Sequence, residues 1–371
     1  MDNNYEATFN EEWEKYKENH KILPNVMILG RTGVGKSSLI NTIFKNYIAE
    51  VSDLVPETQD FKVFRGEEYG ISVNLIDSKG YEINDDADES REAMESFVCK
   101  IQNYIAEAYN NAQKVHLIWY CIPITEERVE PLDKELIKRL SSIESIRGRI
   151  AVILTKCDED DEDCTTAKAF KDVLKELNIP GLQAFETSND EGIEADLDKL
   201  IRWSIDSLDD EDLKDNFISA QQGSLKEKRK RAKAIINKST IAATLVALSP
   251  IPHDSPILIP IQMNMIVRII NIYGISGIAA ISQNVISDIV ISSVGKSLAA
   301  SLVKVIPIAG NIINTVVAGS ITKALGEAIS EICRKAYKDS LAGKKVQWDS
   351  LFDASVVKPV VESYFRKGNR E

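Results

Sequence analysis

The chain has 371 residues, of which 44% are hydrophobic and 27% charged, and its formal net charge is −12. This composition is that of a globular protein and excludes a disordered or collagen-like chain, while the length predicts two domains. The charge is uneven, because residues 1–216 carry about −22 and residues 217–371 about +10. We therefore expect two modules with different partners.

The first 21 residues predict a helix that packs an aromatic stripe on a neighbouring element. Phe9, Trp13 and Tyr16 are spaced by four and three residues among many charged ones, as on one face of an amphipathic helix. A partner-binding arm is the alternative. We expect no signal peptide, because this segment is acidic and has no apolar core. The five cysteines form no C-x-x-C pair, which favours reduced thiols and a cytoplasmic location.

Residues 30–37, with the sequence GRTGVGKS, match G-x-x-x-x-G-K-[ST], the phosphate-binding loop of nucleotide hydrolases. An apolar run before the loop predicts a buried strand, and residues 38–45 predict a helix. Backbone N–H groups of such a loop and the helix N-terminus surround an anion. Lys36 would reach the β- and γ-phosphates, and the Ser37 hydroxyl would ligate Mg²⁺. The predicted contacts are Gly30, Arg31, Thr32, Gly33, Val34, Gly35, Lys36, Ser37 and Ser38.

Two later segments supply groups for Mg²⁺ and for a γ-phosphate. Asp77-Ser-Lys-Gly80 has the form D-x-x-G and follows a strand-like run. Asp77 could hold Mg²⁺ through water, and the Gly80 N–H could bond a γ-phosphate. Thr58 lies in the preceding loop, where its hydroxyl could complete the metal shell; a solvated loop threonine is the alternative. The predicted metal ligands are Ser37, Thr58 and Asp77, and the predicted catalytic groups are Lys36, Thr58 and Gly80.

A strand ending in Thr155-Lys156-Cys157-Asp158 predicts the base specificity. The Asp158 carboxylate can accept two N–H groups from guanine, whereas adenine lacks the amine at that place, so the carboxylate discriminates between the bases. The Lys156 stem would lie over the base. A second segment, Thr187-Ser188-Asn189, ends the last strand-like run and could offer a backbone N–H to the guanine O6. A plain turn is its alternative.

In this order, the five elements resemble the TRAFAC class of GTPases, nearest to its Era-like branch, over about residues 22–208. The resemblance implies a Ras-like α/β fold, with a doubly wound and mostly parallel sheet, that binds GTP and GDP with Mg²⁺. The usual fourth element is N-K-x-D, and Thr155 departs from it as an accepted variant. An ATP-specific phosphate-loop protein is the alternative.

Two departures from the family pattern predict slow hydrolysis. A glutamine that orients water often follows D-x-x-G, and here the residue is Tyr81. In potassium-activated Era-like enzymes an asparagine stands where this chain has Gly33. Arg31, Arg65 and Arg128 are expected to be structural or solvated instead of acting as an arginine finger. We expect stimulation by a partner or by dimerisation across the nucleotide face.

Two other functions stay open at this point. One is an interaction protein that binds nucleotide structurally and hardly hydrolyses it, which Tyr81 would allow. The other is a ribosome- or RNA-associated GTPase, although no recognisable RNA-binding module follows the nucleotide-binding region. Nucleic acid is therefore disfavoured as a partner.

Alternating patterns across residues 25–207 predict the doubly wound sheet. The expected strands are 25–30, 60–66, 71–77, 115–121, 150–155 and 182–187. The expected helices are 36–46, 88–111, 130–146, 165–177 and 194–207. Acidic residues 82–89 fit a mobile switch loop that runs into a helix, with a solvated helix start as the alternative. Those at 158–163 fit a solvated loop and helix start better than a calcium loop. His116 is expected to be packed.

The expected domains are a helix over 1–21, a GTPase domain over 22–215 and an apolar helical domain over 216–371. The basic run 226–233 fits a solvated helix face or, with the apolar tail, an anionic membrane surface. Residues 269–287 and 305–322 carry no charge, and their length approaches a membrane span. Interspersed polar residues and prolines favour a helical bundle over helices in or on a bilayer. Residues 344–371 predict a closing helix with Trp348 and Phe352.

Part of this tail also resembles a known family. Residues 247–254, ALSPIPHD, and residues 261–274, IQMNMIVRIINIYG, resemble the YcjF-like domain of unknown function that follows Era-like GTPase domains in bacteria. The shared features are a Pro-Ile-Pro-x-x-Asp turn and a helix that ends in Tyr-Gly. The resemblance implies an architecture more than a role. It adds to the expectation of a cytoplasmic protein that contacts a membrane peripherally.

Overall fold

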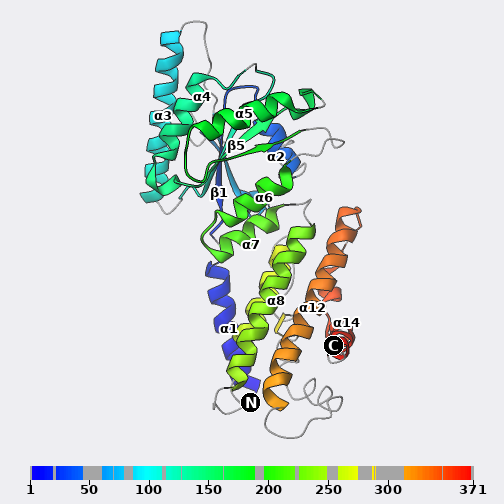
Figure 1. Cartoon of the computed structure of the whole chain (residues 1–371). Coiled ribbons are helices and arrows are strands. Elements are labelled where there is room, and N and C mark those ends of the chain that lie inside the picture. The colour runs from blue at the N-terminus through cyan, green and yellow to red at the C-terminus, as the bar shows by residue number, and fades with distance from the viewer. Residues whose placement is uncertain are drawn as a thin grey trace. The chain divides into compact units, whose positions relative to one another are not determined.

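A computed structural model shows two compact units, Leu23–Gly223 and a second unit made of Met1–Ile22 and Ser224–Glu371 (Figure 1). The first unit thus extends past the expected boundary at residue 215. The structure describes residues 2–19, 22–44, 61–69, 71–78, 87–110, 114–126, 128–161, 163–188, 196–221, 225–248, 258–274, 286–287, 289, 313–344 and 346–368.

The first unit contains a six-stranded sheet in the order β2-β3-β1-β4-β5-β6. The strands are β1 (Asn25–Leu29), β2 (Phe61–Phe64), β3 (Asn74–Ser78), β4 (Leu117–Pro123), β5 (Ile150–Thr155) and β6 (Gln183–Glu186). Among the strands that the structure describes, β2 and β3 pair antiparallel, and the other neighbours pair parallel. Strands β1, β4 and β5 are buried along their whole length, as expected of a parallel sheet covered on both faces. The predicted doubly wound, mostly parallel sheet is confirmed.

The helices of this unit are α2 (Lys36–Phe44), α3 (Ala87–Asn110), α4 (Pro131–Ser141), α5 (Thr165–Glu176), α6 (Leu197–Asp206) and α7 (Glu211–Ala220). The first five match expected helices, but α4 stops earlier than predicted, and a 3-10 helix covers Glu144–Ile146. At its end the Ser142 hydroxyl donates to the Arg139 carbonyl at 2.6 Å, which competes with the helical backbone bond.

Helix α7 was not predicted as an element. The Asp210 carboxylate caps it by accepting from the N–H groups of Asp212 and Leu213, at 2.7 and 3.1 Å. Its Phe217 ring lies edge-on to Phe44 of α2 and Trp119 of β4, with centroids 6.4 and 6.2 Å apart. This aromatic contact explains why the first unit includes α7.

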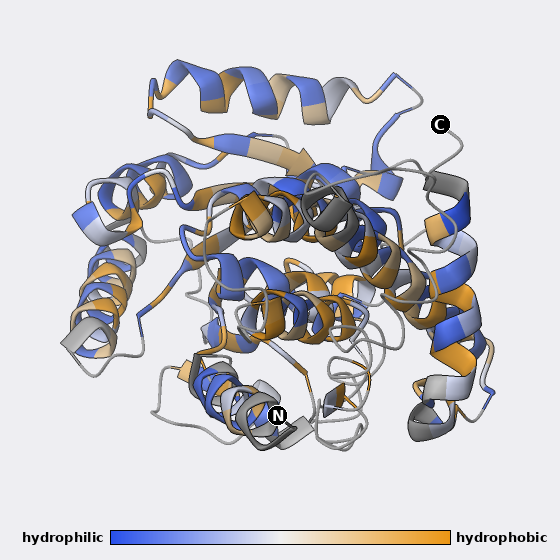
Figure 2. Cartoon of the chain, turned by 90° about the horizontal axis from the view of Figure 1, so that it is seen from below, coloured by the Kyte–Doolittle hydropathy of each residue, from blue (hydrophilic) through white to orange (hydrophobic). Residues whose placement is uncertain are grey.

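The second unit is helical. It comprises α1 (Asp2–Asn19), α8 (Leu225–Leu248), α9 (Leu258–Ile272), α12 (Ile313–Leu341), α13 (Trp348–Leu351) and α14 (Ala354–Gly368). Helix α12 packs against α8, α9 and α14, and α1 packs against α9. Several of its helices carry hydrophobic residues on one side and hydrophilic residues on the other (Figure 2). The predicted all-α character of the tail is confirmed.

The N-terminal helix belongs to this second unit and does not stand alone. Phe9 and Trp13 are buried, with ring centroids 5.9 Å apart. The Tyr16 side chain lies outside the described residues. Phe352 is fully buried near the other end of the chain. Both ends of the sequence therefore contribute buried side chains to the second unit.

Among the helices that the structure describes, none is both long enough and apolar enough to cross a bilayer. Of the two uncharged segments singled out in the sequence, residues 275–285 of 269–287 and residues 305–312 of 305–322 lie outside the described residues.

Candidate functional site

The phosphate-binding loop joins β1 to α2 through three glycines with positive φ. Gly30, Gly33 and Gly35 have φ values of 141°, 78° and 98°. A Cβ on Gly30 would lie 2.6 Å from the Cys121 carbonyl oxygen, so a side chain has no room there. Lys36 is buried, and its Nζ donates to the carbonyls of Gly30 and Arg31 at 3.0 and 2.9 Å. The ammonium group thus lies across the loop that would hold the phosphates.

Asp77, at the carboxyl end of β3, fits a cation. Its Oδ1 is buried and has no hydrogen-bond partner within the part of the chain that the structure describes. Burial raises the pKa of this carboxyl above its ordinary value, and the positive charges of Lys36 and Lys62 oppose that rise. A buried carboxylate oxygen without a donor is costly, and Mg²⁺ with its bound water would satisfy it. Ser37 is exposed on the first turn of α2, as a metal-binding hydroxyl requires.

Thr155, which stands where the N-K-x-D pattern has asparagine, forms a hydrogen bond to the phosphate loop. Its hydroxyl is buried and donates to the Val34 carbonyl of the phosphate loop at 2.5 Å. The end of β5 is therefore fastened to the loop by one side-chain hydrogen bond. This contact is long-range, so the sequence motif alone did not reveal it.

Residues beyond β5 and β6 meet at the same edge of the sheet. The Ser188 hydroxyl donates to Asp158 Oδ1 at 3.1 Å, and the Cys157 N–H donates to the Thr187 carbonyl at 3.1 Å. Lys156 between them has φ 60° and ψ 34°, a left-handed conformation that a lysine rarely adopts. Strained residues of this kind gather at ligand sites. The predicted groups Lys156, Asp158, Thr187 and Ser188 are thus brought together.

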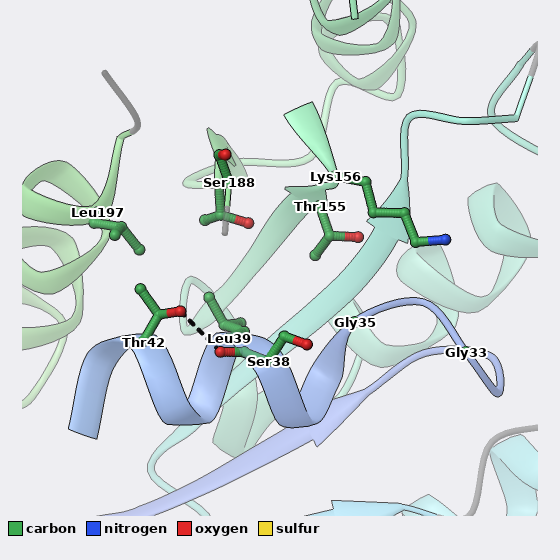
Figure 3. Close-up of a pocket in the computed structure, with 10 residues that line it drawn as sticks. Gly33, Gly35, Ser38, Leu39, Thr42, Thr155, Lys156, Ser188 and Leu197 are labelled. Carbon is green, nitrogen blue, oxygen red and sulfur yellow. Dashed lines mark hydrogen bonds between the residues drawn. The ribbon is translucent and has the colours of Figure 1, made fainter. Parts of the chain in front are cut away.

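A cavity of about 130 Å³ separates these residues from the phosphate loop. Figure 3 shows Ser38, Leu39 and Thr42 along α2 on one side, with Thr155, Lys156 and Ser188 opposite them. Its lining consists of Gly33, Gly35, Ser38, Leu39, Thr42, Thr155, Lys156, Thr187, Ser188 and Leu197. One wall can therefore hold phosphate and the other can read a base.

A partly buried charge cluster beside the loop was not predicted from the sequence. Arg31 forms ion pairs with Glu126, after β4, and with Asp133 of α4, the latter at 3.6 Å. The Tyr120 hydroxyl donates to Asp133 Oδ1 at 2.5 Å. Burial raises the pKa of Glu126, and the Arg31 guanidinium opposes that rise. Arg31 is therefore structural, as expected, but no spacing in the sequence predicted its partners.

Several predicted residues lie outside the described residues: Thr58, Gly80, Tyr81 and Asn189. Most of the expected switch loop, residues 82–86, lies outside them too, and α3 begins at Ala87. Arg128 is exposed and lies 3.6 Å from Glu130.

The acidic cluster at 158–163 serves partly as a helix cap. Asp160 accepts from the N–H groups of Thr166 and Ala167, and Asp161 accepts from that of Thr165. No group of His, Cys, Asp or Glu side chains suited to a metal occurs in the described ranges. The capping bonds fit the expected helix start. His116 is packed as expected, and its Nδ1 accepts the Asn25 N–H at 2.9 Å.

Two parts of this chain match models of known protein families. Residues 25–156 match the family model described as a 50S ribosome-binding GTPase. Residues 212–348 match a domain of unknown function, DUF697. The chain is thus similar to a GTPase family in its first part and to this domain of unknown function in its second part.

Curated relatives include neuronal-specific septin-3 of Bos taurus, 27% identical over 236 residues, or 58% of this chain and 61% of the relative. The matches span 61% of bovine septin-3 and 49% of human septin-3, so this chain covers only part of those proteins. Because septins are among the relatives, the expectation of a specifically Era-like domain was too narrow.

Solved structures also show similarity to the chain. Toc33 from Arabidopsis thaliana, in complex with Mg²⁺ and GMPPNP, is 16% identical with a TM-score of 0.34, covering 57% of this chain and 92% of Toc33. Era in complex with MgGDPNP and a 16S ribosomal RNA segment is 18% identical with a TM-score of 0.32, covering 51% of this chain and 57% of Era. The family match supports GTP binding by the first unit.

Proposed function

We propose that this protein is a Mg²⁺-dependent switch that hydrolyses GTP to GDP and phosphate slowly and is stimulated by a partner or by dimerisation across the nucleotide face. One observation carries the proposal. Glycines of the phosphate loop and Ser188, whose hydroxyl donates to Asp158, line one cavity, and the Thr155 hydroxyl links the end of β5 to the Val34 carbonyl of the loop.

The residues have separate roles in this function. Lys36 leaves the carbonyls of Gly30 and Arg31 and neutralises charge on the β- and γ-phosphates. Ser37 and Asp77 hold Mg²⁺, which supplies charge stabilisation at the phosphates when bound. The loop N–H groups and the N-terminus of α2 orient the phosphate chain. Gly80 and Thr58 complete the site around the γ-phosphate.

Slow hydrolysis follows from what this site offers to the attacking water. Tyr81 stands where a water-orienting glutamine is common, and Gly33 stands where a potassium-binding asparagine is common. Arg31 is engaged by two carboxylates, so it is not free to stabilise the transferring phosphoryl group. The missing charge is supplied by another molecule, as arginine fingers do in related chemistry.

Base specificity is tested with Asp158→Asn. The carboxylate accepts two guanine N–H groups, whereas an amide accepts one and offers an N–H that suits the carbonyl of xanthine. We expect GDP affinity to fall about 100-fold and XDP affinity to rise, since hydrogen bonds to charged groups contribute about 1.5–3 kcal/mol each. Titration with fluorescent GDP, XDP and ADP measures this. Tighter binding of ADP than of GDP by the wild type would overturn the guanine assignment.

Hydrolysis is tested by phosphate release with Mg²⁺, over a wide range of protein concentrations, beside Lys36→Ala. We expect a rate per molecule that rises with concentration and a Lys36→Ala background near zero. A dilute monomer that turns over faster than about 1 s⁻¹ contradicts slow intrinsic hydrolysis. Tight GTP binding with no phosphate release under any condition favours the non-hydrolysing interaction protein, which Tyr81 leaves as the second candidate.

A further inference from the structure

Helix α8 presents one exposed face that changes chemistry along its length. Its exposed basic residues are Lys226, Arg229, Lys230, Lys233 and Lys238, all in the first fourteen positions of the helix. The last two turns expose Ile241, Leu245 and Leu248, at 61, 62 and 64%. At about 1.5 Å per residue the helix is roughly 36 Å long. The face is therefore basic at one end and apolar at the other.

The basic run seen in the sequence divides into two classes in the structure. Lys228 is fully buried, and its Nζ donates to the Ile272 carbonyl at 2.8 Å and lies 5.1 Å from the Tyr337 ring centroid. It therefore holds the end of α9 and offers no charge to a partner. Lys226, Arg229, Lys230 and Lys233 remain on the outer face.

The apolar end of α8 is unusual for this protein. The residues that the structure describes include six exposed large hydrophobic side chains, and three of them are Ile241, Leu245 and Leu248. Their spacing of four and three residues puts them on one side of the helix. Contiguous apolar surface beside charge marks an interaction site more often than scattered single residues do.

We propose that this face of α8 binds an anionic lipid bilayer, with the basic half at the headgroups and the apolar end entering the acyl boundary. Lys and Arg meet lipid phosphates and carboxylates, and the apolar side chains then lose water contact. RNA fits less well, because the exposed face has no aromatic side chain on which a base could stack. The inference goes beyond the proposed nucleotide switch and does not depend on hydrolysis.

Flotation of the full-length protein with vesicles tests the proposal. Vesicles of phosphatidylcholine with about 30% phosphatidylserine are compared with pure phosphatidylcholine. We expect binding to the anionic vesicles alone. The double variant Lys230→Glu/Lys233→Glu should weaken binding about 30-fold or more, at about 1 kcal/mol for each basic residue lost. The double variant Ile241→Ser/Leu245→Ser should weaken it about 10-fold or more.

Matched controls lie on α12, where Lys335 and Lys338 are exposed and Leu341 is 50% exposed. Lys335→Glu/Lys338→Glu and Leu341→Ser should keep wild-type binding. If these controls lose as much vesicle binding as the α8 variants, then net charge or general hydrophobicity determines binding, and the proposal fails. It also fails if wild type ignores anionic vesicles, or if only the basic double variant loses binding, because then nothing inserts.

Two further measurements separate this proposal from its rivals. The proposal is overturned if the wild type binds RNA and does not bind vesicles, and if Lys230→Glu/Lys233→Glu abolishes the RNA binding. The face of α8 would then bind nucleic acid. If Ile241→Ser/Leu245→Ser only dissociates a dimer in size-exclusion chromatography, the face is an interface between copies. GDP titration of the wild type and of each variant distinguishes the failure of the membrane proposal from the failure of the nucleotide switch. A variant that binds GDP normally but no longer binds vesicles supports the α8 surface. A wild type that does not bind GDP refutes the nucleotide switch alone.

Discussion

A single hydroxyl joins the two halves of the nucleotide site. Thr155 Oγ1 donates to the Val34 carbonyl of the phosphate loop at 2.5 Å, and both residues are buried. A buried carbonyl that loses its donor costs about 1–3 kcal/mol. The threonine therefore contributes to the stability of the loop as well as to the position of Asp158.

We expect Thr155→Val to lower both stability and nucleotide affinity. The variant keeps the shape but leaves the Val34 carbonyl without its donor, so unfolding free energy should fall by about 1–3 kcal/mol. GDP affinity should fall about 10-fold, because the loop loses its anchor. Urea unfolding and fluorescent GDP titration measure the two effects. Thr155→Ser keeps the hydroxyl and should behave as wild type; equal losses in both variants would sink this explanation.

Lys228 makes the stability of the helical unit depend on pH. Complete burial lowers the pKa of its ammonium group to about 7 from an ordinary value of 10.5. Between these values the unfolded chain binds a proton that the folded chain does not, so stability rises as pH rises through this window. Below pH 7 both states are protonated, and the cost of burying the charge is constant.

Lys228→Met should remove that dependence. Across the two pH units from 7 to 9, wild type should gain about 2–3 kcal/mol relative to the variant, at about 1.4 kcal/mol per pH unit. Urea unfolding of the helical unit at pH 7, 8 and 9 gives the two profiles. Groups such as Cys333, whose thiol pKa burial raises, titrate alike in both proteins. Parallel profiles would show that Lys228 stays charged when folded.

Close helix packing in the second unit depends on glycines of α12. A Cβ on Gly326 would lie 2.7 Å from Ile236 Cγ1 of α8 and 2.9 Å from Met265 Sδ of α9. A Cβ on Gly319 would lie 2.2 Å from the Thr244 hydroxyl of α8. These glycines let α12 approach its neighbours, at the cost of helix propensity.

Gly326→Ala should therefore destabilise the helical unit. On an exposed helix face the same change raises the free energy of unfolding by about 1 kcal/mol, because alanine has the higher helix propensity. Overpacking against Ile236 and Met265 should cost about 1–3 kcal/mol. Thermal unfolding followed by circular dichroism measures the change. Ser340→Ala, at an exposed position of the same helix, is the control and should have little effect. A gain in stability for Gly326→Ala would refute the close approach.

At the scale of the whole molecule, the unit Leu23–Gly223 is inserted in the sequence of a helical unit to which both ends of the chain contribute. Phe9 and Trp13 of α1 are buried, and α1 packs against α9. A change near residue 9 should therefore affect the unit that contains residue 365, and not the unit that binds nucleotide. Sequence distance misleads here, because the core is built from segments more than 200 residues apart.

Phe9→Ala should lower the stability of the helical unit by about 3–5 kcal/mol, the usual cost of removing a buried ring. The transition that GDP shifts should stay in place. GDP at about 100 times its Kd adds about 2.7 kcal/mol to the unit that binds it, which identifies that transition in a calorimetric scan. Glu11→Ala, on the exposed side of α1, is the control. Loss of the GDP-dependent transition in Phe9→Ala would mean that the two units unfold together.

Most of the sheet was predictable because its signals are local. Apolar runs such as 25–29 and 150–155 predicted buried parallel strands, and the glycines of residues 30–35 predicted a turn that needs positive φ. Helix α7 was not predicted, because in the sequence only Asp210 marks its start. The contact that stabilises it, between Phe217 and Trp119, is visible only in the folded structure. A contact between residues 98 positions apart leaves no periodicity to detect.

The sequence by itself determined which chemistry we predict for the site: a lysine for phosphates, hydroxyl and carboxylate groups for Mg²⁺, and Asp158 for guanine. These choices follow from residue type and order. Only the tertiary structure decided which charges stay available. It buried Lys228 within the basic run, engaged Arg31 with Glu126 and Asp133, and tied Thr155 to Val34. The physical reason is that burial and pairing depend on neighbours brought together by folding, and a one-dimensional pattern does not contain them.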